Sequence, residues 1–282
     1  MAKGFNMSSF NSKMHQIQRK VEREINSELN KVTRKFESDV NREIRKYNSQ
    51  IRKNQQIVSR ELSKLKSHST IRSTYTISLD AMHQHYIAIG NSYDDDYVTP
   101  QQKYIFDLIE QEQANGIITA NAIQNNEFPY DDTSDIEIGD KLASVSEDLN
   151  NRWKGAVYAL NPINPDASRH FCTSAREIFT EFIEIKAPDN LVLAFDPDCD
   201  KTPERKTPTR RAKIKYMMRN LDIDPSAVDF ADADITNILE LFHILSDGTH
   251  GEAGRYETEK LNRVKKRVEQ GINFLCEISR NV

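Results

Sequence analysis

Residues 17–51 read IQRKVEREINSELNKVTRKFESDVNREIRKYNSQI, and this stretch decides the fold of the N-terminal part of the chain. Its apolar residues stand three or four positions apart: Ile17, Val21, Ile25, Leu29, Val32, Phe36, Val40, Ile44, Tyr47 and Ile51. This spacing aligns them on one face of an α-helix. No Gly or Pro interrupts residues 5–89, so we expect one long amphipathic helix over about residues 13–66.

The apolar stripe has about 3.75 residues per turn, which exceeds the 3.6 residues per turn of a straight α-helix. We therefore expect a nearly straight or slightly right-handed coiled coil rather than a leucine zipper. A single apolar stripe on a charged rod needs a partner, so we expect a homo-oligomer through residues 13–66. The alternative is a helix that packs on its own C-terminal domain.

Charge is distributed unevenly along the 282 residues, although the net charge is only −4. Residues 13–66 carry 15 Lys/Arg and seven Asp/Glu, whereas residues 94–150 carry two Lys and 14 Asp/Glu. The basic rod is suited to contact the acidic stretch or nucleic acid. We divide the chain into a long helix or coiled coil (1–90), an acidic connecting segment (91–150) and a helical domain (151–282).

Three shorter segments lie between the long helix and the C-terminal domain. Residues 70–79 alternate polar and apolar residues with β-branched side chains, which fits either a strand or a continued helix. Residues 100–115 are expected to form a short helix that stops at Gly116. The run Asp94 to Asp96 fits a solvated turn better than a metal site, because it lacks the spacing of a calcium loop.

The C-terminal domain shows four helical patterns, which together predict an all-α protein with a long N-terminal helix and a C-terminal bundle. The first helix should start at Asn164 as N-cap and end before Pro188. The second should run from Thr207-Pro208 to about Leu221. The third should cover residues 234–246, and the last should begin near residue 258.

Composition restricts the class of protein further. The chain has no apolar run of about 18 residues, and no signal-like apolar segment follows its N-terminus. Its three cysteines are far apart and lack zinc-site spacing. We therefore expect a cytoplasmic protein with no membrane contact, no bound metal and no cofactor.

One candidate site is the segment 169–177, which reads RHFCTSARE. On a helix, His170, Ser174 and Glu177 share one face, and Arg169, Thr173 and Arg176 share the neighbouring face. Such a polar cluster beside an apolar stripe is either a catalytic site or a buried ion-pair network.

A second candidate is the glycine-rich loop around residues 247–255. His250 is placed to act as a general acid or base, beside Asp247, and Arg255 is suited to contact phosphate. His243 lies near the apolar stripe of the preceding helix, where packing is its expected role. The alternative is a structural loop in which the glycines end one helix and start the next.

A basic helix face is the third candidate, with Lys213 also expected to point outward. It is expected to guide a nucleic-acid backbone, or else to be a solvated surface. Its residues are Arg205, Lys206, Arg210, Arg211, Lys215 and Arg219.

Three stretches carry a resemblance to a known family: NPINPDASRHFCTSARE (161–177), PTRRAK (208–213) and SDGTHGE (246–252). They resemble predicted nucleases named for their association with prokaryotic PIWI proteins, which occur in bacterial anti-phage loci. The resemblance covers roughly 151–282, and it implies a nuclease of bacterial defence.

The same domain is more distantly similar to the helical HEPN ribonucleases, which pair an Arg with a His a few residues later. His250 fits the His position, but Ile244, Leu245 and Ser246 occupy the places where the Arg would stand. Arg169 or Arg176 would then supply the positive charge from another helix.

These resemblances lead us to expect a metal-independent, RNase-like domain in a defence effector or accessory protein. A rival expectation is a non-enzymatic coiled-coil scaffold or sensor that docks another defence protein. A third possibility is a metal-dependent nuclease, because Pro165-Asp166 and Glu184-Ile185-Lys186 imitate a restriction-type signature. That signature requires strands, whereas these residues are expected to be helical.

Overall fold

The computed structural model describes residues 7–67, 73–92, 98–125, 138–161, 163–247 and 258–280. Every regular element in these ranges is an α-helix, and the only β-type contact among them is an isolated bridge between Lys201 and Pro208. The predicted all-α class, with a long N-terminal helix ahead of a helical bundle, is confirmed. None of the described helices is apolar enough over a sufficient length to cross a membrane.

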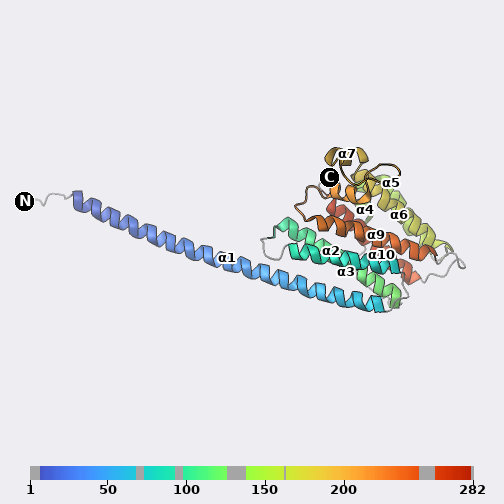
Figure 1. Cartoon of the computed structure of the whole chain (residues 1–282), viewed down its shortest axis with the longest axis horizontal. Helices are drawn as coiled ribbons and strands as arrows, with labels where there is room; N and C mark the ends of the chain where they lie inside the picture. Colours follow the sequence, from blue (N-terminus) through green and yellow to red (C-terminus); the bar gives the residue numbers. More distant parts are fainter. Residues whose placement is uncertain are drawn as a thin grey trace, which may run out of the picture. The chain divides into compact units, whose positions relative to one another are not determined.

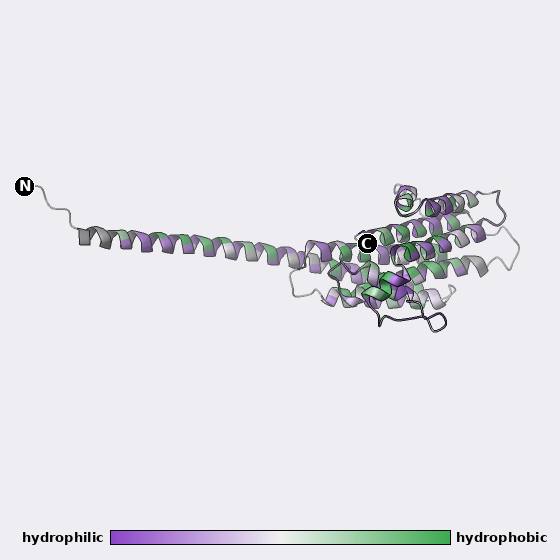
Figure 2. Cartoon of the chain, turned by 90° about the horizontal axis from the view of Figure 1, so that it is seen from above, coloured by the Kyte–Doolittle hydropathy of each residue, from purple (hydrophilic) through white to green (hydrophobic). Residues whose placement is uncertain are grey.

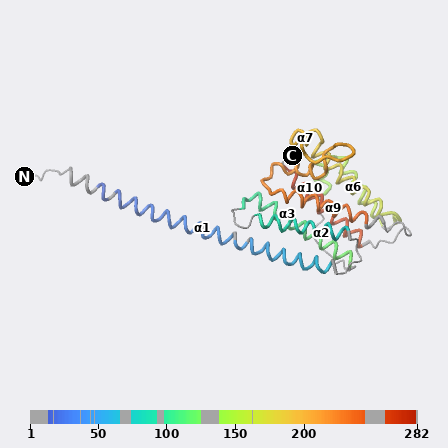
Figure 3. Tube along the Cα trace, viewed as in Figure 1, coloured from blue at the N-terminus to red at the C-terminus, as the bar shows by residue number. Residues whose placement is uncertain are grey.

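The helices follow one another along the chain as Figures 1 and 3 show. They are α1 (Met7–Ser67), α2 (Ser73–Ser92), α3 (Pro100–Asn125), α4 (Ile138–Val145), α5 (Glu147–Ala159), α6 (Ala167–Lys186), α7 (Asp189–Phe195), α8 (Arg210–Met217), α9 (Pro225–Asp247) and α10 (Thr258–Ile278). By their contacts the residues form two compact units, Met1–Lys53 and Asn54–Val282.

The first unit consists of the N-terminal part of α1. Figure 2 shows hydrophobic residues recurring between hydrophilic ones along this helix. Five apolar residues of the predicted stripe are 45 to 68% exposed: Val21, Ile25, Leu29, Val32 and Phe36. Exposed apolar side chains in a row are unfavourable in water, so this face is suited to a partner helix.

The second unit has a core in which α2 packs on α9 and α3 packs on α10. The strand alternative for residues 70–79 is wrong over the described residues 73–79, which belong to α2. The buried residues of α2 recur with helical spacing, because Tyr75, Leu79, Met82, Tyr86 and Ile89 all face the core. Residues 70–72 and the run of Asp94 to Asp96 lie outside the described residues.

Gly116 does not end the helix that starts at Pro100, so the predicted stop was wrong. A Cβ atom at this position would lie 3.2 Å from Leu79 and 3.3 Å from Met82. The Tyr75 hydroxyl also donates to the Gly116 carbonyl oxygen over 3.3 Å. The glycine therefore allows α2 to cross close to α3, while the helix continues to Asn125.

Helix starts in the C-terminal part also differ from the prediction. α6 starts at Ala167, because the Asn164 side chain accepts from the Asp166 amide and thus closes the preceding turn. α8 starts at Arg210, where Thr209 rather than Thr207 is the N-cap and accepts from the Ala212 amide. α9 already begins at Pro225, nine residues before the predicted start.

A buried arginine lies at the centre of this core. The Arg267 side chain of α10 is fully shielded from solvent, and it donates to Glu112 of α3 over 2.6 Å and to Asp234 of α9. One guanidinium thus faces two carboxyl groups inside the bundle. Burial, with a contribution from Glu112, raises the pKa of Asp234 to about 7 despite the attraction of Arg267.

This shift predicts that Asp234 lowers stability as pH rises from about 4 to 7. The folded chain holds a proton on Asp234 in this window, whereas the unfolded chain, with an ordinary Asp pKa near 3.9, does not. Asp234→Asn removes the titration but keeps the shape of the side chain. The free energy of unfolding of the variant, relative to that of the wild type, should therefore rise with pH by up to about 1.4 kcal/mol per pH unit.

Urea unfolding at several pH values between 5 and 8 measures this difference. The matched control is Asp198→Asn, which changes an exposed aspartate of the same chain. A stability difference between Asp234→Asn and wild type that stays constant across this range would contradict the prediction.

Candidate nucleic-acid site between α5 and α6

Helices α5 and α6 form a hairpin whose connecting turn is built by two asparagines. Asn161 accepts from the Ile163 amide over 3.0 Å, and Asn164 accepts from the Asp166 amide over 3.1 Å. The Asn164 amide group also donates to the Ala159 carbonyl oxygen at the end of α5 over 2.8 Å. These bonds fix the first turn of α6 relative to the last turn of α5.

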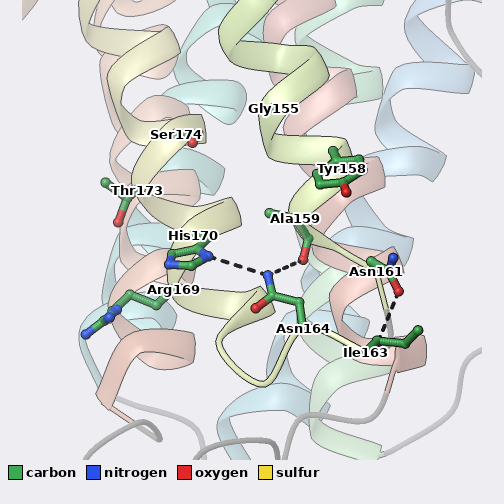
Figure 4. A pocket seen from close by; sticks show the side chains of 10 residues that line it. All are labelled: Gly155, Tyr158, Ala159, Asn161, Ile163, Asn164, Arg169, His170, Thr173 and Ser174. Atoms are coloured by element: carbon green, nitrogen blue, oxygen red, sulfur yellow. Dashed lines mark hydrogen bonds between the residues drawn. The ribbon is translucent and has the colours of Figure 1, made fainter.

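A pocket of about 690 Å³ opens where this turn meets the two helices (Figure 4). One side comes from the last turns of α5 and the connecting turn, and the other from the first turns of α6. The lining residues are Gly155, Tyr158, Ala159, Asn161, Ile163, Asn164, Arg169, His170, Thr173 and Ser174. Of the polar residues predicted at 169–177, Arg169, His170, Thr173 and Ser174 line this pocket.

His170 and Arg169 are the ionisable groups of the pocket wall. Both are more than half exposed, so the alternative of a buried ion-pair network is wrong for them. Arg169 forms an ion pair with Asp166 over 2.5 Å, and the His170 Nε2 atom lies 3.6 Å from the same carboxylate. The His170 Nδ1 atom lies 3.4 Å from the Asn164 amide nitrogen. Because that amide donates, Nδ1 is the acceptor and Nε2 carries the proton in the neutral ring.

The opposite wall offers apolar and aromatic surface. Tyr158 is 81% exposed and Ile163 is 87% exposed, which is unusual for residues of this size. An exposed tyrosine ring across a pocket from an arginine and a histidine is suited to bind a nucleotide, with the base on the ring and the phosphate at the cation. The N-terminus of α6 adds partial positive charge on the side of Arg169 and His170.

The remaining residues of the 169–177 segment have other surroundings. Glu177 forms an ion pair with Arg152 over 2.6 Å, and Arg152 also forms one with Asp148 over 2.7 Å. Arg176 is exposed and has no ion pair within the described part of the chain. Neither Arg176 nor Glu177 lines the pocket. Cys172 is buried, which raises the pKa of its thiol to about 12 and makes it a poor nucleophile at neutral pH.

The basic face is largely neutralised by acidic residues of the same unit. Arg210 pairs with Asp232 over 2.6 Å, Arg211 pairs with Asp229, and Lys215 pairs with Asp196 over 2.7 Å. Lys213 points inward, contrary to the prediction, since its side chain is 5% exposed and is shared by Glu184 and Asp189. Sequence spacing placed the cations on one helix but did not reveal carboxylates from α6, α7 and α9.

The other predicted cations differ from these paired residues. Arg219 lies over the Tyr216 ring, 3.9 Å from its centroid. Arg205 and Lys206 are exposed and have no ion pair among the described residues. They are thus the two members of the predicted face whose charge is open to an anionic ligand.

The loop candidate cannot be placed in the same way. His250 and Arg255 lie outside the described residues, and so does the side chain of Asp247. His243 is exposed on α9, so the expectation that it serves core packing was wrong.

The restriction-type alternative is contradicted by the fold. Asp166 precedes the first turn of α6 and Glu184 lies in its last turn, so the two are about 27 Å apart along one helix. Within the described ranges, no three His, Cys, Asp or Glu side chains are grouped to hold a metal ion.

Comparison with protein families gives a match in this region. Residues 142–275 match the model of the family described as predicted pPIWI-associating nuclease. The resemblance stated for the C-terminal part is therefore confirmed, and the matched range includes the α5–α6 pocket. No curated protein and no solved structure matches the chain.

Gly155 gives a direct test of this pocket. It lies within α5, and a Cβ atom added there would meet nothing within 4 Å. Gly155→Ala should therefore stabilise the protein by about 1 kcal/mol, since alanine favours the helix. Gly155→Phe should also fold, and its ring would fill the pocket. The affinity of this variant for a short RNA, relative to Gly155→Ala, therefore tests whether the pocket binds nucleic acid.

Thermal unfolding and fluorescence anisotropy with a labelled oligonucleotide measure these effects. Gly155→Ala serves as the control for the change of backbone propensity. Equal RNA affinity for Gly155→Phe and Gly155→Ala would show that the pocket does not take part in binding.

Proposed function

We propose that the chain is a nuclease of bacterial anti-phage defence that cleaves RNA in the cytoplasm without a tightly bound metal. The observation that carries this proposal is that His170 and Arg169 line the same open pocket. This pocket lies inside the range that matches a family of predicted nucleases. A histidine can transfer protons near neutral pH, and an arginine can stabilise charge on a phosphate.

The chemistry would be an internal transfer within the RNA strand. A histidine takes the proton of a ribose 2′-hydroxyl, and the 2′-oxygen forms a bond to phosphorus. The bond from phosphorus to the 5′-oxygen breaks, and a second acid gives that oxygen a proton. The products are a 2′,3′-cyclic phosphate and a 5′-hydroxyl. Arg169 would stabilise the charge on the two free phosphate oxygens.

Two groups for proton transfer are needed. His170 would be the base, and its Nδ1 atom would take the proton once the RNA displaces the 3.4 Å contact of this atom with the Asn164 amide. We propose His250 as the second, with Asp247 orienting it and Arg255 contacting phosphate. Arg176 is exposed on the helix that carries His170, and it would hold the strand next to the reacting phosphate. Glu177 would position α5 through Arg152 rather than touch the substrate. Lys206 would bind the strand at a distance, with Arg205.

Replacing either histidine should therefore abolish most of the activity. His170→Ala and His250→Ala should each lower the cleavage rate by roughly 10²–10⁴-fold, and a chelator should not change the wild-type rate. His170→Ala should leave the thermal midpoint nearly unchanged, because the side chain is largely exposed. His243→Ala, which removes an exposed histidine of α9, is the matched control.

A cleavage assay with a single RNA at several pH values gives these rates. Activity that survives both substitutions would refute proton transfer by these histidines. Activity that disappears with chelator would instead point to a bound metal.

We also propose that the protein self-associates through α1. Support comes from the exposed row of Val21, Ile25, Leu29, Val32 and Phe36 on a charged helix. The same row favours a second function, in which the chain is a scaffold that docks another defence protein. A second copy is the simpler partner, because it presents an identical apolar stripe.

Substitutions on this stripe separate the two functions. Leu29→Gln with Phe36→Gln keeps helix propensity but removes apolar surface, so an oligomer should dissociate. Lys31→Gln with Lys35→Gln changes exposed residues of the same helix and is the matched control. Light scattering gives the molar mass. A wild-type protein that is monomeric at micromolar concentration would rule out self-association and leave docking of another protein as the role of the α1 stripe.

A further inference from the structure

A second pocket lies at the other end of α6, where it meets α7, α8 and α9. Its volume is about 410 Å³, within the range that small-molecule sites occupy. One part of its wall is apolar, formed by Phe179, Ile183, Pro208, Ile235 and Leu239. The rest is polar and comes from Thr180, Glu184, Asp189, Thr202, Arg205, Thr207, Arg210 and Lys213.

The charges in this wall are arranged so that one cation remains available. Lys213 is held by Glu184 and by Asp189 over 2.6 Å, so it is neutralised inside the wall. Arg210 is held by Asp232 over 2.6 Å and also donates to the Thr236 hydroxyl over 2.5 Å. Arg205 has no ion pair within the described residues, and it is therefore free to bind an anion.

The loop that carries Arg205 is ordered by its own hydrogen bonds. The Thr202 amide donates to the Thr207 carbonyl oxygen over 2.7 Å, and the hydroxyls of these two residues lie 3.0 Å apart. The Lys206 amide donates to the Thr202 carbonyl oxygen over 3.1 Å. Both threonines line the pocket together with Arg205, so the loop contributes a cation and two hydroxyl-bearing side chains to the wall.

We propose that this α6–α9 pocket binds one nucleotide. The phosphate binds Arg205 and the hydroxyls of Thr202 and Thr207, which are suitable donors for it. The base lies against the apolar wall. The Glu184 carboxylate, half exposed, uses one oxygen for Lys213 and presents the other to an amino group on the base. Bases with an exocyclic amino group should therefore bind better than uracil.

The position of the pocket on α6 connects it with the α5–α6 pocket. His170 and Thr180 are ten residues apart, which is about 15 Å along the helix. Arg176 is exposed between them. This length corresponds to a few nucleotides of a single strand, so the bound nucleotide is either part of the RNA being cleaved or a free mononucleotide. Only the first case rests on the proposed nuclease function.

Binding of the four ribonucleoside monophosphates to the full-length protein tests the proposal by calorimetry. Arg205→Gln removes the phosphate partner, and Thr180→Tyr fills the mouth from an exposed position on α6. Each should weaken AMP, CMP and GMP binding by about tenfold or more. Lys201→Gln removes a neighbouring exposed charge that does not line the pocket, and it should leave the affinity unchanged. UMP should bind weakest to wild type.

The source of the nucleotide follows from a second measurement in the His170→Ala protein, which is expected to bind RNA without cleaving it. Competition between AMP and a short RNA, lost in Arg205→Gln, would assign the pocket to the RNA strand. AMP binding without competition would assign it to a free mononucleotide. The proposal is overturned if no monophosphate binds wild type at millimolar concentration and both pocket variants bind RNA like wild type. Because binding is the readout, a protein without nuclease activity would not by itself overturn it.

Discussion

The guanidinium of Arg267 has no access to solvent, and its hydrogen-bond donors must be met inside the bundle by the carboxyl groups of Asp234 and Glu112. A buried charge without its partner is costly, typically by several kcal/mol. These two contacts therefore fix how α10 lies along α9 and α3. One turn further along both helices, Gly271 of α10 meets Ile238 of α9, where an added Cβ would lie only 2.3 Å away. Shape and charge thus select the same register.

This register also places the helix that carries both pockets. Phe179 of α6 lies 3.1 Å from the position that a Cβ of Gly271 would take, so α6 packs directly onto the α9–α10 crossing. Polar residues on the first turns of α6 then line the α5–α6 pocket, and those on its last turns line the α6–α9 pocket. The positions of the exposed groups on α6 thus depend on an ion pair buried between α3, α9 and α10.

The sequence predicts the helices well where one face is apolar, because a period near 3.6 has few competing explanations. It predicted the long N-terminal helix, the end of α6 before Pro188 and the joint placement of Arg169, His170, Thr173 and Ser174. It failed where a residue depends on a distant partner. Gly116 was predicted to end a helix because its close contact with α2 cannot be read from the neighbouring sequence. Likewise, nothing near Arg267 in the chain marks it as buried.

Ion pairing explains the largest difference between the predicted and the observed site. Six of the seven cations at residues 205–219 suggested one continuous basic surface, but the partners of Arg210, Arg211 and Lys215 come from residues 18 to 22 positions away. Paired charges attract phosphate weakly, because the carboxylate already supplies the negative charge. Only cations left unpaired by the fold, such as Arg176 and Arg205, keep their full charge for a ligand.

These two unpaired cations, together with His170, follow α6 rather than α8. His170 stands at its start beside Arg169, whose ion pair with Asp166 is largely exposed. Arg176 is exposed near the middle of α6, and Arg205 lies in the loop beside its end. A single strand of nucleic acid carries one charge per nucleotide and readily follows a line of separated cations. An even basic face would bind a strand at any register, whereas two pockets joined by one exposed arginine favour a single register. That arrangement is what a nuclease needs if it is to present one phosphodiester bond to His170.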